Sequence, residues 1–263
     1  MKVLKVLLCL VLCLGFALPA LGEETEALLS RLQVDGIIRL RGETVICDSS
    51  SVTLDNRVIR IQGGGSYAIT GTGSNFQVSF TASKGETCEL VLCSAQWDCD
   101  FGPAVTAQAD LLTIILVEGT ENFLSDSKDR LDREESPSKA LVYASDDLTL
   151  QGTGSLTLEA NLGTALRCRD YLLVDGPTLV IRSANDGLRG SDGVTIRSGS
   201  ISIIAQGDGI QASNEDSGKG NIYLEGGTVV ITAEKDALQA EGTVVYQGGT
   251  VTTRCGEDST KGL

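Results

Sequence analysis

One turn motif recurs along this chain at nearly constant intervals. An Asp-Gly pair, or a small-residue equivalent, is followed by an apolar residue, which in the second half of the chain is Leu166, Leu188, Ile210 and Leu238 in turn. The first two intervals are 22 residues long (166 to 188 and 188 to 210), and the third is longer because SNEDSGKGN is inserted at 213–221. A period in the twenties is typical of a solenoid, in which each repeat stacks on the next.

Two further short runs of β-type residues follow each turn. The second run of each coil is GSLTL (154–158), GPTLVI (176–181), SGSISI (198–203), GGTVVI (226–231) or GGTVTT (248–253). Apolar and polar residues alternate in these runs, which predicts strands with one face inward. We place the same turn upstream at Ala68-Ile69, Ala104-Val105 and Ala140-Leu141, where intervals of 36 residues predict longer loops.

Strands this short form a stable sheet only when each coil stacks on its neighbours and the backbone pairs along the whole stack. The signature of leucine-rich repeats is absent, and the period of the calcium-binding nonapeptide repeat is too short. The pattern therefore predicts an all-β fold, a single-stranded parallel β-helix with three short strands in each coil. About eight coils at ~4.8 Å each would give a rod ~40 Å long.

The remaining segments define the domain organisation. Residues 1–22 contain Lys2, Lys5, an apolar run and a small-residue cleavage site, which predicts a secretory signal peptide and a secreted or cell-surface protein. We expect residues 23–263 to form one β-helix domain with charged loops at 124–139 and 213–221. Residues 23–33 are expected to form a short helix or lead-in that caps the open end of the stack.

The charge balance excludes several classes of partner and chemistry. The chain has 21 Lys and Arg residues against 35 Asp and Glu residues, a formal net charge of −14. Such a surface repels nucleic acid and anionic membranes, so we expect no nucleic-acid partner and no membrane insertion after signal cleavage. The sequence contains no histidine, which excludes His-based catalytic triads and His metal ligands.

Aspartates of successive turns occupy the same position of the repeat. Once stacked, their carboxylates would lie about 4.8 Å apart and repel one another unless something neutralises them. Calcium would do so, because it binds carboxylate and carbonyl oxygens. The alternative is that each aspartate caps its own turn by accepting backbone N–H bonds. The candidate ligands, which include residues of nearby loops and of a second acidic region at 145–147, are Asp186, Asp192, Asp208, Asp236, Asp216 and Asp146.

Several segments together resemble the secreted bacterial carbohydrate-binding β-helix proteins that were characterised as cellulose- and acid-sugar-binding proteins. These segments are RIQGGGSYAITG (60–71), GTENFLSD (119–126), ASDDLTLQGTGSLTL (144–158), NDGLRGSD (185–192), GDGIQA (207–212) and KDALQAEG (235–242). The resemblance spans roughly residues 35–255. It implies a right-handed parallel β-helix related in shape to pectate lyases, bound calcium, and binding rather than cleavage of plant polysaccharide.

Three functions remain open at this point. The first is a noncatalytic polysaccharide-binding protein that recognises an acidic plant polysaccharide with the help of calcium, or binds cellulose, through Arg189, Arg167 and Tyr223. The second is a calcium-dependent polysaccharide lyase of the pectate type, which would need a base for the proton next to the uronate. The third is a structural solenoid of the cell surface. Cellulose fits less well than an acidic polymer, because the chain has one Trp and few other aromatic residues to form a flat platform.

Overall fold

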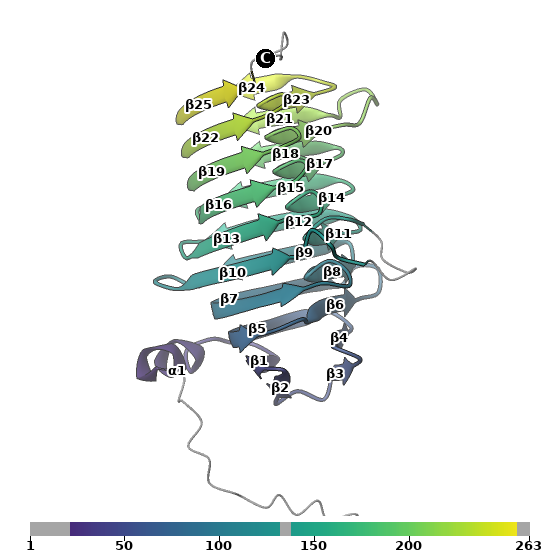
Figure 1. Ribbon diagram of the computed structural model, residues 1–263, viewed down its shortest axis with the longest axis vertical. Coiled ribbons are helices and arrows are strands. Elements are labelled where there is room, and N and C mark those ends of the chain that lie inside the picture. Colours follow the sequence, from purple (N-terminus) through teal and green to yellow (C-terminus); the bar gives the residue numbers. More distant parts are fainter. Residues whose placement is uncertain (1–21, 132–137, 257–263) are drawn as a thin grey trace, which may run out of the picture.

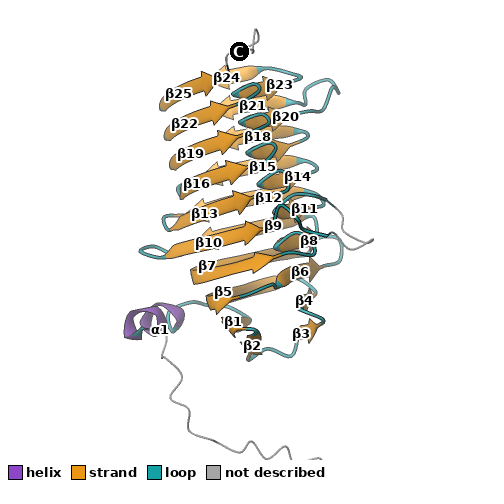
Figure 2. Ribbon diagram, viewed as in Figure 1, coloured by secondary structure: helices purple, strands orange, loops and turns teal. Residues whose placement is uncertain are grey.

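The computed structural model describes residues 22–131 and 138–256, and these residues form one tall stack of coils (Figure 1). The predicted signal peptide lies outside the described residues, apart from Gly22. Strands make up nearly all of the regular structure, and the described part contains a single short helix (Figure 2). In the described part, no helix has the length and apolar character needed to cross a membrane.

The first elements lie at the end of the stack from which α1 projects (Figure 1). Two antiparallel hairpins, β1–β2 and β3–β4, begin the stack, and longer parallel strands follow. The elements are α1 (Glu23–Leu29), β1 (Gly36–Gly42), β2 (Thr44–Cys47), β3 (Val52–Asp55), β4 (Val58–Gln62), β5 (Gly65–Gly73), β6 (Gln77–Thr81), β7 (Thr87–Cys99), β8 (Val105–Gln108), β9 (Leu111–Leu116) and β10 (Glu121–Asp126).

From β11 onward each coil consists of three strands, the first of which has only three residues. The strands are β11 (Val142–Ala144), β12 (Asp147–Gly152), β13 (Ser155–Ala160), β14 (Leu166–Cys168), β15 (Tyr171–Asp175), β16 (Thr178–Ser183), β17 (Leu188–Gly190), β18 (Gly193–Ile196), β19 (Ser200–Ala205), β20 (Ile210–Ala212), β21 (Asn221–Leu224), β22 (Thr228–Ala233), β23 (Leu238–Ala240), β24 (Val244–Tyr246) and β25 (Thr250–Cys255).

Equivalent strands of successive coils pair in parallel. The three-residue strands belong to a nine-stranded sheet in the order β23-β20-β17-β14-β11-β8-β6-β4-β3. The other two strands of each coil belong to a sixteen-stranded sheet, whose two halves meet at the long strand β7. This arrangement of about eight coils confirms the predicted parallel β-helix.

The register of the second half of the chain confirms the repeat predicted from the turns. Leu166 pairs with Leu188, Leu188 with Ile210, and Ile210 with Leu238. These side chains are almost fully buried, because each fills the interior of its own coil and packs on the equivalent residue of the next coil. The alternation of buried and exposed residues in β16, β19 and β22 follows from the period of two in a strand.

Upstream, the structure corrects the predicted alignment of the repeats. Val142, rather than Leu141, takes the turn position and pairs with Val105. Ile69 lies in β5, which pairs with β7 in the sixteen-stranded sheet, and Val78 of β6 pairs with Val105 instead. The prediction was wrong there because the hairpins and the long strands of the early coils interrupt the regular spacing of the turns.

The first of the two predicted charged loops begins later than predicted, whereas the second lies where it was expected. Leu124 and Asp126 pair with Trp97 and Cys99 of β7 and are buried, so residues 124–126 end strand β10, and the loop predicted at 124–139 begins later. Residues 132–137 of this loop lie outside the described residues. The second predicted loop, at 213–221, lies between the end of β20 at Ala212 and the start of β21 at Asn221.

The lead-in helix does not cap the end of the stack, contrary to our expectation. Leu29 of α1 packs on Ala68, Val91 and Cys93, which form an apolar cluster on the outer surface of the sixteen-stranded sheet, separate from the main core. Figure 1 shows α1 beside β5, while β1–β4 occupy the end itself. The helix packs there because Ala68, Val91 and Cys93 form an apolar patch on the outer surface of β5 and β7.

Candidate functional site

The middle residue of each three-residue strand points outward from the nine-stranded sheet. Because the strands pair in register, these residues form a column along the stack, which we call the polar column. In the order of the coils, its members are Tyr143, Arg167, Arg189, Gln211 and Gln239. The last four have planar polar side chains that are neither fully buried nor fully exposed, whereas Tyr143 is only 9% exposed.

Two members of the polar column line a surface pocket of about 400 Å³. Arg167 and Arg189 contribute to one wall, and Lys139 and Asn185 lie around them. Three cationic side chains therefore surround one hollow in a protein with a net charge of −14. Clefts lined by one sign of charge concentrate ligands of the opposite sign, so this pocket favours an anion.

A buried ion pair ties the two walls of this pocket together. The Arg130 guanidinium donates to the Asp126 carboxylate at 2.8 Å, and both side chains are 0% exposed. Arg130 also donates to the carbonyl oxygens of Ser138 and Ala140, which belong to one wall. Asp126 accepts from the backbone N–H groups of residues 161 and 162, and Leu162 belongs to the other wall. The pair thus fixes the distance between the two segments.

The structure brings together two of the three predicted substrate-binding residues. Arg189 is held by Asp186 at 3.5 Å and by the Ser213 hydroxyl at 3.4 Å, and Arg167 stands directly beside it in the column. Tyr223 lies in β21 and pairs with Thr195, so it faces outward from the sixteen-stranded sheet, away from the pocket. The buried neighbours Ile222 and Leu224 indicate that Tyr223 points outward, but this alternation does not show which sheet the strand joins.

Asp186, Asp208 and Asp236 are neighbours on successive coils, as the repeat predicts, but their contacts are those of turn caps. The Asp186 carboxylate accepts the N–H of Asp208 at 3.1 Å, and the Asp208 carboxylate accepts the N–H of Asp236 at 3.1 Å. Asp208 also accepts from the Gln211 amide at 2.8 Å, which holds that member of the polar column flat. Burial raises the pKa of Asp208, and the nearby charge of Asp186 adds to this increase.

A second group of aspartates, which we call the aspartate column, follows the three-residue strands β11, β14 and β17 and consists of Asp146, Asp170 and Asp192. Its members are equivalent by register, and the backbone N–H groups of Asp170 and Asp192 donate to the carbonyl oxygens of Asp146 and Asp170. The carboxylates of Asp146, Asp147 and Asp170 approach so closely that one oxygen from each lies within 4.8 Å of the others. Among the described residues, no Lys or Arg forms a salt bridge with any of these three. Burial, the hydrogen bond that the protonated Asp146 carboxyl donates to Asp170, and the surrounding carboxylates raise the pKa of Asp146 to about 6.

Two further predicted metal ligands lie near the insert at 213–221 and have different surroundings. Asp192 is 4% exposed and accepts from the Lys219 ammonium at 2.6 Å, and it also contacts the Asn214 amide. The hydrogen bond with the Asp192 carboxylate raises the pKa of Lys219. Asp216 is exposed, and its backbone N–H donates to the Asn214 side chain. The insert therefore supplies its own cation to one end of the aspartate column, and sequence reasoning did not foresee this pairing.

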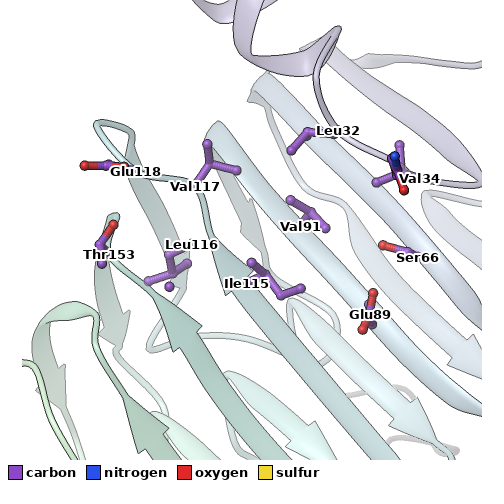
Figure 3. A pocket seen from close by; sticks show the side chains of 12 residues that line it. Leu32, Val34, Ser66, Glu89, Val91, Ile115, Leu116, Val117, Glu118 and Thr153 are labelled. Carbon is purple, nitrogen blue, oxygen red and sulfur yellow. The ribbon is translucent and has the colours of Figure 1, made fainter.

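An apolar groove lies on another face, between the lead-in after α1 and the outer surface of β7 and β9 (Figure 3). Its volume is about 390 Å³. Val91, Ile115 and Val117 form its floor, and Glu89 and Glu118 lie at its edges. The apolar floor continues the surface on which Leu29 packs. The groove contains neither an aromatic nor a cationic side chain, which makes it a poor site for an acidic sugar.

Comparison with known proteins agrees with this architecture. The family model for carbohydrate-binding domain-containing proteins matches residues 55–262. A carbohydrate-binding domain-containing protein of Acetivibrio thermocellus is 27% identical over 229 residues, covering 82% of this chain and 80% of the relative. A polysaccharide lyase-like protein from C. thermocellum, solved as a gadolinium derivative, has a similar structure with a TM-score of 0.74 at 27% identity, covering 86% of this chain and 98% of that one.

The stacked coils place this chain among the parallel β-helix proteins, and its shape is similar to that of the polysaccharide lyase-like protein. The family match extends over most of the described stack, from β3 to its last coil. The chain belongs to the carbohydrate-binding domain-containing protein family.

Proposed function

We propose that this protein is a noncatalytic polysaccharide-binding protein whose preferred ligand is an acidic polymer. The observation that carries the proposal is the pocket in which Arg167, Arg189 and Lys139 converge on the surface of a strongly acidic rod. A guanidinium is planar and binds a carboxylate through two parallel hydrogen bonds, so the pair of arginines suits the carboxylate of a uronate residue. Crystalline cellulose suits the face less well, because Trp97 is only 2% exposed and no flat aromatic platform adjoins the pocket in the described residues.

We further propose that calcium assists binding, held by Asp146, Asp147 and Asp170. These residues fit the ion, because three carboxylates within 4.8 Å supply the hard oxygen ligands that calcium prefers, and their mutual repulsion calls for a cation. Bound calcium would supply positive charge that a uronate carboxylate could share. The related structure was solved as a gadolinium derivative, and gadolinium is also a hard cation that binds oxygen ligands. Asp186 and Asp208 suit the ion less well, since their oxygens already accept hydrogen bonds.

The test is binding to immobilised polygalacturonate, cellulose and a neutral glucan, each with calcium and with chelator. We expect retention on polygalacturonate that is lost in Arg167→Ala and reduced by chelator. The matched control is Arg182→Ala, which removes the same charge from an exposed position of β16 on the other sheet. Equal retention of both variants would refute the assignment of the pocket.

An absorbance assay and the binding result together test the two other functions, the polysaccharide lyase and the structural solenoid. A lyase of this type could use an arginine or a lysine as its base. Incubation with polygalacturonate should produce no increase in ultraviolet absorbance, since Arg189 and Lys219, which lie near the acidic turns, are paired with Asp186 and Asp192. Absorbance from unsaturated products would show that the protein is a lyase. Failure of the wild-type protein to bind any of the three polymers would leave the structural role of a cell-surface solenoid. Export, which the predicted signal peptide at 1–22 supports, is part of the proposal.

A further inference from the structure

The last coil of the stack, formed by β23, β24 and β25, leaves one end of the β-helix open. These three are the terminal strands of their sheets, and among the described residues each pairs only with a strand of the coil before it. Figure 1 shows this open end at the top of the stack, far from α1. A terminal strand leaves alternate backbone N–H and C=O groups unpaired, which makes it a template for a further strand. Three such edges therefore surround the open end.

The inward side chains of the last coil are uncovered at the open end. Val244 and Tyr246 pair in register with Ile222 and Leu224 of the preceding coil, so they occupy interior positions of the repeat. They are nevertheless 39% and 61% exposed, whereas Ile222 and Leu224 are 0% and 2% exposed. Three residues of β25 pair with buried residues of β22 but are themselves partly or fully exposed: Val251, Thr253 and Cys255. The open end thus presents a largely apolar centre inside a ring of strand edges.

The opposite end of the stack is closed by the chain itself. Strands β2 and β3 run antiparallel to β1 and β4, and their apolar residues pack on the core at Val45, Cys47 and Val52. The interior residues that they cover are at most 2% exposed, namely Ile38, Leu40, Ile59 and Ile61. Two ion pairs of the hairpins add charge at this end, Arg57 with Glu43 and Arg60 with Asp55. Solenoids need such caps for solubility, and the described part of the last coil has none.

The surface that fits an open end is a second open end. The partner has to supply strand edges around a closed perimeter and apolar side chains at its centre, as the last coil of another copy does. The closed end does not fit, because its hairpins already cover the core. Two open ends meet when one copy is turned about an axis perpendicular to the stack, and the facing strands then run antiparallel, a pairing that needs no connection between them. Residues 257–263, EDSTKGL, contain one apolar residue, which is too few to fill the apolar centre.

We infer that two copies of this protein join end to end through their last coils in a closed two-fold dimer. Because the same surface is used on both copies, the contact closes at two chains and covers the apolar centres of both open ends. The inference does not rest on the proposed function, since the pocket lies at β14 and β17 and β20 separates these strands from the last coil.

The test is the mass of the purified protein, measured by analytical ultracentrifugation over a range of concentrations. We expect the mass of a dimer, and solution scattering should show a particle nearly twice as long as one stack. Val244→Arg should weaken the dimer about a hundredfold, because the two-fold contact contains the substitution twice and buries two like charges. The matched control is Val230→Arg, at a 42% exposed valine on the outer face of β22, which should leave the dimer intact.

Thr253→Arg is the second variant, which should also dissociate the dimer. Thr253 is exposed, so its replacement removes no buried contact within one chain, and circular dichroism shows whether each variant keeps the β-helix. A protein that stays a single chain at every concentration would overturn the inference, as would a mass that grows beyond two chains or equal dissociation by Val230→Arg. A dimer that forms only after residues 257–263 are removed would also overturn it, because those residues would then be what covers the open end.

Discussion

The buried ion pair between Asp126 and Arg130 offers the sharpest test of how the pocket is held in place. Asp126→Asn keeps the shape of the side chain and an oxygen that can accept the backbone N–H groups of residues 161 and 162. It removes the carboxylate charge that pairs with Arg130, whose side chain is 0% exposed. Removing the charge of one partner of a buried ion pair is strongly destabilising, so we expect the free energy of unfolding to fall by about 3–5 kcal/mol.

The second variant isolates the charge. Asp126→Asn combined with Arg130→Met removes both charges of the pair. We expect its loss to be smaller than the sum of the two single losses by at least ~2 kcal/mol, because replacing both charges of a buried pair is often nearly neutral. Urea unfolding followed by Trp97 fluorescence is the assay, and this indole is buried in β7 beside Leu124 of β10. A loss below ~1 kcal/mol for Asp126→Asn, or strict additivity in the double variant, would refute the reasoning.

Three further predictions test the columns and the coil turns. In chelator-treated protein, the pKa of Asp146 is about 6 in the folded state against roughly 3.9 in the unfolded state, so the folded state binds the proton more tightly. The free energy of unfolding should therefore decrease by ~1 kcal/mol, after solvent screening, as the pH rises from about 4 to about 6, and a thermal melting series should show this decrease. Calcium affinity measured by calorimetry should weaken as the pH drops below about 6, because the proton competes with the ion. Asp208→Ala leaves the N–H of Asp236 without its acceptor and should lower the free energy of unfolding in urea by about 1–2 kcal/mol, and an unchanged midpoint would contradict the capping role. Gly199→Ala places a Cβ against a carbonyl oxygen of the preceding coil at a φ of 112°, so it should lower the free energy of unfolding by more than ~1 kcal/mol in the same assay. Gly218→Ala, at a φ of 84° with open space around it, should cause a smaller loss. Equal losses would argue against the steric clash.

The fold was predictable where the chain repeats itself and less so where it begins. Turns at Leu188, Ile210 and Leu238 fixed the register of the last coils, because a strand tolerates no slip once one face is buried. The early coils contain hairpins and long strands, whose alternation is the same whichever sheet they join. Ile69 was therefore placed in the wrong sheet, since alternation alone does not identify the partner strand.

The candidate site was predictable in its residue types and less so in its geometry. Arg167 and Arg189 have equivalent positions in the repeat, so the sequence indicated their proximity. The cluster of Asp146, Asp147 and Asp170 was only partly visible, because its last member follows a different strand and becomes a neighbour through the stacking of coils. An alignment of the residues that follow each three-residue strand would have revealed this cluster, because an aspartate recurs at that position in successive coils. Hydrogen bonds between an aspartate and the next turn have no signature in the sequence.

In this stack each coil contacts only the coil before it and the coil after it, apart from its loops. Duplication of one 22-residue unit would therefore lengthen the rod without disturbing its interior, and the new unit would bring one more outward side chain to the nine-stranded sheet. Such a fold can match its reach to a longer ligand by copying a gene segment, and can alter its selectivity by changing a single codon in one copy.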